Sequence, residues 1–306
     1  MAQEIGRATG TVGTLARGIR PKPTLWQNIG SFAGRKPLGA FGGAVAVLLI
    51  VVAIFAPFIA THDPTRTNSA YVFAAPGSSG LLLGGDQVGR DVFSRLVYGA
   101  RISMEVGVLS VLFGVTIGAF IGIVSGYFRG KTDLIIQRVV DAMMAFPALI
   151  LALAVMAALG ASITNVIIAL SIVFIPATAR TIRAQALSIR ETDYVLAATA
   201  VGVGHWRIML RHIAPNCAAT YIVLATISLG YAIVVEASLS FLGVGVPPSV
   251  PSWGGMLTGA AQQYVEVAPW LGVFPGLTIA IVVFAWNLLG DALRDVLDPR
   301  LRGTGT

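Results

Sequence analysis

Long apolar stretches alternate with short polar ones along this chain of 306 residues. An unpaired charge is costly in hydrocarbon, so charge-free runs of about 20 residues predict membrane spans. Such runs cover residues 38–60, 106–128 and about 269–290, and a fourth, about 217–242, is interrupted only by Glu236. The run 142–179 is too long for one span and fits two that join at residues 160–162. The pattern therefore predicts six helices with both chain ends on one side of the membrane.

Composition agrees with an all-α integral membrane protein. Hydrophobic residues make up 56% of the chain and charged residues only 11%, whereas a soluble domain carries about 25% charged residues. The 35 glycines also fit, because glycine is tolerated in membrane helices and lets them approach closely. The single cysteine, Cys217, excludes an intrachain disulfide.

The basic residues predict the orientation. All but four of the 21 Lys and Arg residues fall on the side of the N-terminus, which the positive-inside rule makes cytoplasmic. The net charge of +7 therefore follows from topology and predicts no nucleic-acid partner. The predicted parts are a cytoplasmic tail (1–37), a first span (38–60), an outer loop (61–102), a five-span core (103–290) that contains a cytoplasmic loop at 183–216, and a cytoplasmic C-terminal tail (291–306).

The 183–216 loop is expected to form two helices. Residues 184–200 lack Gly and Pro and are rich in helix formers, and Gly202 and Gly204 should end that helix. A second helix is predicted at 205–214, stopped by Pro215. Its apolar face would consist of Trp206, Met209, Leu210 and Ile213, beside a basic edge of Arg207 and Arg211. So short a helix is marginal alone, so it should pack on another protein or lie on lipid.

Glycines recur every four residues along the second span, at Gly114, Gly118, Gly122 and Gly126. They form one smooth face on that helix, which predicts close contact with a neighbouring helix. The neighbour is expected within this chain, with a partner subunit as the alternative.

Two carboxylates lie at or near membrane depth. Glu236 is a functional candidate there, for a substrate amine or a gate, and the competing interpretation pairs it with Arg101. Asp141 begins the third span and is expected to pair with Arg138 or to cap a helix. With Ser240, these two are the candidates for the translocation path or gate.

The outer loop carries charges of both signs, at Asp86, Arg90, Asp91, Arg95 and Arg101. They could contact an external protein or form an internal salt-bridged latch. Opposite charges are adjacent in the chain, which favours the latch. Three tryptophans are predicted to anchor the chain at the membrane surfaces: Trp253, Trp270 and Trp286.

Other chemistry finds little support. Residues 126–132 imitate a phosphate-binding loop, but Ser125 stands where that pattern requires glycine. His205 and His212 lack further ligands for a metal. No motif of an intramembrane enzyme occurs in the spans. We therefore expect no catalysis by this chain and no bound cofactor or metal.

The 183–216 loop resembles the signature loop of ABC importer permeases. Ala197-Ala198, Gly202 and Pro215 stand in register with that pattern. Three positions depart from it: Leu196 replaces the usual glutamate, His212 an isoleucine and Ala214 a leucine. The missing glutamate removes one carboxylate from the expected contact with an ATPase.

The resemblance extends over residues 35–302, to dipeptide and oligopeptide permeases of the DppC/OppC type. The blocks that carry it are Leu83–Arg95, Tyr98–Ser103, Asp141–Pro147, Glu236–Gly243 and Asp298–Leu301. It implies a type I importer permease core of six transmembrane helices with a cytoplasmic coupling-helix loop. It further implies alternating access that imports di- or oligopeptides across a bacterial cytoplasmic membrane.

The same resemblance implies partners in the lipid bilayer and on both sides of it. These are a second homologous permease, two cytoplasmic ATPases that hold ATP and Mg, and an extracytoplasmic substrate-binding protein. The loop residues expected to couple to the ATPase are Leu196, Ala197, Ala198, Gly202, Trp206, Arg207, Leu210, Arg211 and Pro215. The alternatives are nickel, glutathione or haem as substrate of the same architecture, or an ion-coupled secondary transporter that uses Glu236 or Asp141.

Overall fold

The structure is a computed structural model that describes residues 30, 32–34, 36–258, 263–264 and 266–297. Residues from Leu38 onward form one compact unit. The predicted tails, apart from a few residues, lie outside the described part, as do Arg300, Arg302 and the block Asp298–Leu301. In the short unit before Leu38, the Lys36 amide donates a hydrogen bond to the Phe32 carbonyl.

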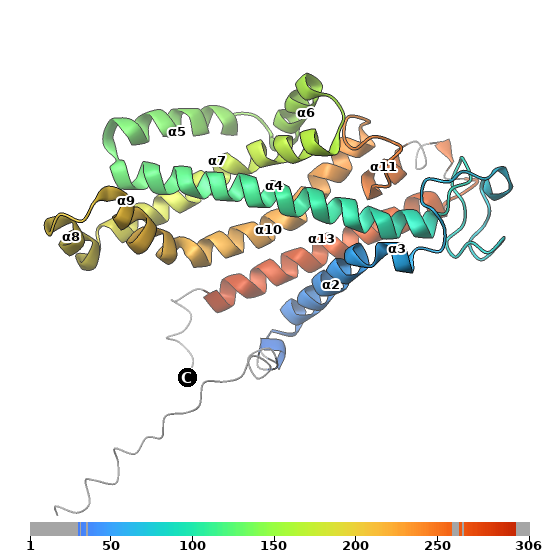
Figure 1. The fold of residues 1–306 in the computed structure, drawn as a ribbon, viewed down its shortest axis with the longest axis horizontal. Coiled ribbons are helices and arrows are strands. Elements are labelled where there is room, and N and C mark those ends of the chain that lie inside the picture. Colours follow the sequence, from blue (N-terminus) through green and yellow to red (C-terminus); the bar gives the residue numbers. More distant parts are fainter. Residues whose placement is uncertain (1–29, 31, 35, 259–262, 265, 298–306) are drawn as a thin grey trace, which may run out of the picture. The chain divides into compact units, whose positions relative to one another are not determined.

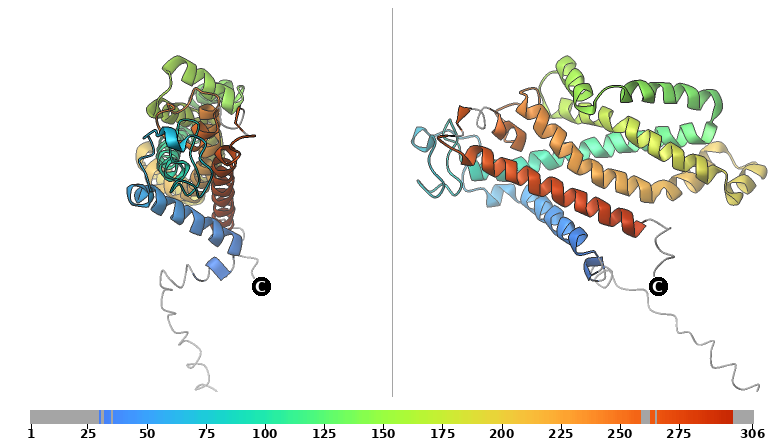
Figure 2. Two further views of the ribbon diagram at one scale, coloured as in Figure 1. Left: turned by 90° about the vertical axis from the view of Figure 1, so that its right-hand side faces the viewer. Right: turned by 180° about the vertical axis from the view of Figure 1, so that it is seen from behind.

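Five helices of the described part are long and apolar enough to cross a membrane, and a bent pair can supply a sixth span. The five are α2 (Pro37–Ile54), α4 (Val92–Phe128), α7 (Ile163–Arg190), α10 (Ala214–Phe241) with the turns before it, and α13 (Trp270–Leu297). Figure 1 and Figure 2 show α4, α7 and α10 packed side by side, with α13 along α10. The all-α membrane fold predicted from the hydrophobic pattern is confirmed.

Glycines bring α4 and α7 into direct backbone contact. A methyl group added at Gly118 would lie 2.7 Å from the Ile175 carbonyl oxygen, and one added at Gly122 would lie 2.5 Å from that of Ala179. Gly114 and Gly126 meet the same helix further along. The predicted close contact is therefore within this chain, and each of these positions excludes a side chain larger than hydrogen.

The third predicted span is not one straight helix. Helix α5 (Gly130–Met144) and helix α6 (Ala148–Leu159) meet at an angle of 90° around Pro147, because proline cannot continue a helix through its own position. Helix α6 has 12 residues, about 18 Å of rise, which is too short for a hydrocarbon core of about 30 Å. The predicted joint at 160–162 is confirmed, since α7 begins at Ile163 with Ser162 as its cap.

The outer and cytoplasmic loops predicted from the sequence lie at opposite ends of the long helices. Helices α8 (Asp193–Ala200) and α9 (His205–Ile208) lie at one end, and the segment 61–91, with α3 (Ala56–Ile59) before it and the turn η2 (Ser69–Tyr71), lies at the other (Figure 1). Helix α11 (Trp253–Leu257) packs beside α10 and α13. The separation places the two candidate sites on opposite sides of one helical core.

Two of the three predicted surface tryptophans belong to the core. Trp253 is buried and donates a hydrogen bond from its indole N–H to the Leu96 carbonyl at 2.9 Å. Trp286 is buried among α2, α4 and α13 side chains. The prediction of membrane anchors was wrong for these two, because helices from distant parts of the chain pack over them. Trp270 reaches the Gly85 carbonyl at 3.3 Å.

Candidate coupling and gating sites

The cytoplasmic loop does contain a separate helix, but it begins later than predicted. Helix α7 continues to Arg190, so the first part of the predicted loop helix is an extension of the fourth span. The chain then turns at Thr192, whose hydroxyl donates a hydrogen bond to the Ile189 carbonyl at 2.6 Å. Helix α8 follows. The carboxylate of Asp193, in the first turn of α8, interacts favourably with the positive end of the helix dipole.

Gly202 ends α8 as predicted. Its φ is +78°, a left-handed conformation that glycine adopts without steric cost. The Val203 amide donates to the Ala198 carbonyl and the Gly202 amide to the Thr199 carbonyl, each at 3.0 Å. These two bonds form a Schellman motif, which satisfies the last carbonyls of the helix.

The second predicted helix does not end at Pro215. Helix α9, the π-helical turn η3 (Met209–Ile213) and α10 follow one another without a break. Pro215 lies in the first turn of α10, directly after the π-helical turn, and the chain remains helical through it. The prediction failed because proline at a helix start and proline after a helix end look alike in a sequence.

The apolar face predicted for that second helix is divided between two surroundings. Met209 and Ile213 are buried in the core of this chain, together with Val195 and Tyr127. Trp206 and Leu210 remain exposed, as do Arg207 and Arg211. Trp206 stacks on Phe120 of α4 with 6.2 Å between ring centroids. This segment is therefore continuous with α10 and not a separate short helix.

Helix α8 has the features of a docking helix instead. Val195 is its only buried side chain. Its outer surface carries apolar side chains that nothing in the described part covers: Tyr194, Leu196 and, just after it, Val201, which is 80% exposed. Exposed apolar groups of this kind, clustered at the end of a membrane helix, mark an interaction surface.

Contacts around α8 can pass its movement to three long helices. The Tyr194 hydroxyl accepts a hydrogen bond from the Asn216 side chain of α10 at 3.1 Å. The Tyr127 hydroxyl of α4 lies 2.8 Å from His205 Nδ1. Helix α7 runs directly into the turn before α8. The sequence did not indicate the Tyr127–His205 contact, because 78 residues separate the two side chains.

Ion pairs brace the helices next to this loop. Arg183 of α7 contacts Asp133 of α5 through two nitrogens, each 2.5 Å from a carboxylate oxygen. Asp141 pairs with Arg180, not with Arg138 as predicted. Helix α5 folds back on α7, which brings Arg180 to the carboxylate, while Arg138 lies on the same helix three residues before it. Asp141 is half-exposed and tied to a cation, so its contacts indicate a bracing role.

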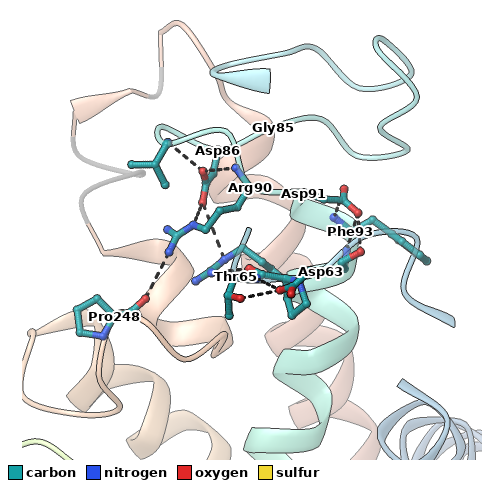
Figure 3. Close-up of polar contacts among 12 residues, drawn as sticks. Asp63, Thr65, Gly85, Asp86, Arg90, Asp91, Phe93 and Pro248 are labelled. Carbon is teal, nitrogen blue, oxygen red and sulfur yellow. Dashed lines mark hydrogen bonds and ion pairs between the residues drawn. The ribbon is translucent and has the colours of Figure 1, made fainter. Parts of the chain in front are cut away.

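At the opposite end of the core, Asp86 organises a compact polar cluster (Figure 3). It accepts hydrogen bonds from the backbone amides of Val88 and Arg90, each at 2.9 Å, and from Arg90 Nε at 2.6 Å. Arg95 Nε lies 3.9 Å away, on the buried first turn of α4. The internal latch favoured from the sequence is therefore present, although its ion pair joins Asp86 to Arg90 and not Arg90 to Asp91.

The two arginines also hold neighbouring segments. Arg95 donates to the Pro64 carbonyl at 3.1 Å, and Arg90 NH1 lies 3.5 Å from the Pro248 carbonyl (Figure 3). We call Asp86, Arg90 and Arg95, with these two carbonyls, the outer latch. It joins the segment after α3, the start of α4 and the loop after α10. Arg101 is exposed and takes no part in it.

Asp91 has a different task, as the N-cap of α4. Its carboxylate accepts from the amides of Phe93 and Ser94, each at 3.2 Å, and from the hydroxyls of Ser94 at 2.6 Å and Thr61 at 2.7 Å. Burial raises the pKa of this carboxyl, but the hydrogen bonds from Ser94, Thr61 and His62 outweigh burial and hold the pKa below its usual value.

Glu236 is buried where α4, α10 and α11 meet. Its carboxyl accepts from the Ser240 hydroxyl at 2.9 Å and lies 3.4 Å from that of Ser103, and Ser252 is a further hydroxyl partner. Ser240 Oγ also accepts from the Val246 amide at 3.1 Å, which connects the loop after α10. Within the described residues, Glu236 makes no ion pair, so the predicted pairing with Arg101 was wrong. Ser240 is one turn away on the same helix, whereas Ser103 and Ser252 are distant in sequence, and no spacing pattern could have indicated those two.

The fold defined by these helices is that of an importer permease. The structure is similar to the inward-facing methionine ABC transporter MetNI, with a TM-score of 0.55 over 67% of this chain and 96% of that chain at 18% identity. Residues 114–303 match the model of the binding-protein-dependent transport system inner membrane component. Residues 24–76 match the N-terminal TM domain of oligopeptide transport permease C.

Curated relatives align over nearly the whole chain. A putative peptide transport system permease protein of Brucella suis is 45% identical over 86% of this chain and 88% of its own length. The di/tripeptide transport system permease protein DppC of Pseudomonas aeruginosa is 42% identical over 92% and 93%. The glutathione transport system permease protein GsiD of Escherichia coli is 41% identical over 92% of each. The chain therefore belongs to the family of inner membrane components of binding-protein-dependent transport systems. It is a multi-pass permease subunit.

Proposed function

We propose that this permease moves di- or oligopeptides into the bacterial cytoplasm, driven by ATP that partner subunits bind with Mg and hydrolyse. Relatives at 39–45% identity are named for peptide, dipeptide or glutathione transport, which supports this substrate class. In this proposal a second, homologous permease completes the pathway, an external binding protein delivers the peptide, and both chain ends face the cytoplasm.

One observation carries the coupling part of the proposal: the exposed apolar surface of α8. Helix α8 is held by one buried side chain and protrudes at the end of the core opposite the outer latch. An ATPase that grips Tyr194, Leu196 and Val201 could displace α8 when its subunits close. The Tyr194–Asn216 and Tyr127–His205 contacts would carry that displacement to α10 and α4. This is alternating access driven from the cytoplasm.

The Glu236 cluster would act as the opposite gate, and the outer latch would hold the outer loop beside it. Both join the start of α4 to the loop that follows α10. Ser240 belongs to this gate because its hydroxyl contacts both Glu236 and Val246. Asp86, Arg90 and Arg95 would then serve mainly to hold the outer loop. Asp91 caps α4, and Arg101 is left free to meet the binding protein.

The test is purification of the tagged chain from its own membranes in mild detergent. The wild-type chain should bring with it a second permease and an ATPase, identified by mass spectrometry and ATP hydrolysis. Leu196→Asp with Val201→Asp should lose the ATPase and keep the second permease, because a buried charge without a partner is costly. Leu82→Asp, at an exposed position of the outer loop, is the matched control and should lose neither.

Uptake measurements then distinguish between the candidate substrate classes. The reconstituted assembly should take up radiolabelled di- and tripeptides with ATP, and an uncoupler should leave uptake unchanged. Glutathione, itself a tripeptide, is the second candidate because several relatives are glutathione permeases. Uptake of glutathione but not of other peptides would select it. A wild-type chain that purifies alone, with uptake abolished by the uncoupler, would refute ATP coupling.

A further inference from the structure

A groove with a volume of about 640 Å³ runs between α4 and α7. Apolar side chains from both helices line most of it, among them Leu109, Phe113 and Ile117 of α4 and Ile167 of α7. Glu105 is the one charged residue among the described residues that line it. The volume falls within the range of about 300–1,000 Å³ that is typical of small-molecule sites.

The sequence places these groove residues on one face of α4. Residues 105, 109, 113 and 117 follow one another at intervals of four and so form a single row. Gly114 and Gly118 lie beside that row and press α4 onto α7, where a methyl group at Gly114 would lie 2.6 Å from the Ser171 carbonyl oxygen. The close contact of the two backbones forms the floor between the two rows of large side chains.

Glu105 stands at the outer mouth of the groove. It is 23 residues before Phe128, the last residue of α4, or about 35 Å along the helix at about 1.5 Å per residue. A hydrocarbon core is about 30 Å thick, so the carboxylate lies near its outer edge. The side chain is exposed, and no hydrogen bond or ion pair to it occurs among the described residues. It is available to a ligand that enters from outside.

We propose that this groove receives the peptide during passage and that Glu105 binds the protonated amino terminus of the peptide. The inference rests on the proposed function and adds a recognition residue to it. A carboxylate and an ammonium form a strong, charge-assisted hydrogen bond. The uncharged walls below it would accept varied side chains without demanding a particular one. The same face of α4 continues to Phe120, which stacks on Trp206 of the 183–216 loop.

The experiment measures binding to the membrane site alone. The complete transporter is placed in nanodiscs without its binding protein, and radiolabelled trialanine and N-acetyl-trialanine are titrated. The wild-type transporter should bind the free-amine peptide at least about tenfold more tightly than the acetylated one, which lacks the charge. Glu105→Gln should remove this preference, and Glu105→Asp should keep part of it. Asp63→Asn, at an exposed carboxylate of the outer loop outside the groove lining, is the control and should keep all of it.

Three outcomes would overturn the inference. An unchanged preference in Glu105→Gln would remove Glu105 from amine recognition. Absence of binding of either peptide, with loss of the second permease from Glu105→Gln preparations, would assign the groove to the interface between permeases. Absence of binding with intact assembly would leave lipid as its occupant. ATP-driven uptake by the wild-type system, measured in parallel, would in each case keep the proposed function standing. Its absence for every peptide would refute that function separately.

Discussion

The outer loop and helix α8 lie at opposite ends of the same helices, and they are held in different ways. In the outer loop, the buried Asp86 side chain receives hydrogen bonds from two backbone amides and one arginine, with a second arginine close by. Helix α8 has one buried side chain, Val195. Its other ties are polar contacts at the surface, such as the Tyr194–Asn216 hydrogen bond at 3.1 Å, and the turn before it carries the exposed Arg129–Glu191 ion pair.

This difference separates a fixed end from a movable one. Buried, fully hydrogen-bonded charges are costly to disturb, because removing one partner leaves the other without compensation. A surface ion pair contributes only about 0–1 kcal/mol, and segments with few buried contacts open at low free energy. In the proposed function, the element that follows an ATPase belongs to the second kind, and the outer loop would keep its form while the helices move.

The largest effect is expected when the fixed end is broken. Asp86→Ala leaves the partly or fully buried guanidinium groups of Arg90 and Arg95 without their carboxylate. We expect the free energy of unfolding to fall by about 3–5 kcal/mol, measured by thermal and denaturant unfolding in detergent. Asp63→Ala in the same loop, where the carboxylate is exposed and bonds only to Thr65 within the described residues, should change little. Equal stability of the two variants would contradict the distinction between latch and surface.

A smaller effect on stability, but a larger one on coupling, is expected at the movable end. Val195→Ala removes the only buried side chain of α8 and should lower the free energy of unfolding by about 1–2 kcal/mol. Peptide moved per ATP hydrolysed should fall further than stability does, because α8 would then shift without carrying the core. Val72→Ala, at an exposed position of the outer loop, is the control. A coupling ratio unchanged in Val195→Ala would show that α7 alone transmits the movement.

The smallest effect concerns acid. The pKa of Asp91 is lowered in the folded state, so its ionised form stabilises the fold above the unfolded-state pKa of about 3.9. That contribution is lost as the pH falls below about 4 and through the folded-state value. Between pH 5 and pH 3, Asp91→Asn should therefore lose less stability than the wild type, while starting lower at pH 7 by about 1 kcal/mol for the weakened cap. In the control Asp193→Asn, at the exposed start of α8, the free energy of unfolding should depend on pH as in the wild type. The same pH dependence in Asp91→Asn would disprove the role of the Asp91 carboxylate.

Local rules predicted the features that depend on neighbours in the chain. The four-residue spacing of Gly114 and Gly118 indicated a close helix contact, and the structure supplies it against α7. Gly202 ends α8, and residues 160–162 separate α6 from α7. The mixed charges of the outer loop favoured an internal latch, although the ion pair that forms it joins Asp86 to Arg90.

Several failures involve partners distant in sequence. Glu236 meets Ser103 across 133 positions, and Asp141 meets Arg180 across 39. Cations nearer in the sequence, such as Arg138 for Asp141, were the more obvious partners. In the structure, the carboxylate of Asp141 contacts Arg180 of α7 instead. The burial of Met209 and Ile213 has the same origin, since their cover comes from α4 and α7.

Taken by itself, the sequence determined that the chain crosses a membrane several times, where most spans begin and end, and which family it resembles. Apolar length, charge and motif spacing can all be read from residues that are near one another in the chain. The first two locate the spans because placing a charge in hydrocarbon is costly. Only the tertiary structure decided that α8 is the exposed helix, that serines surround Glu236, and that Glu105 opens a groove between α4 and α7. Those features depend on which helix faces pack together, and packing joins side chains that no spacing along the chain connects.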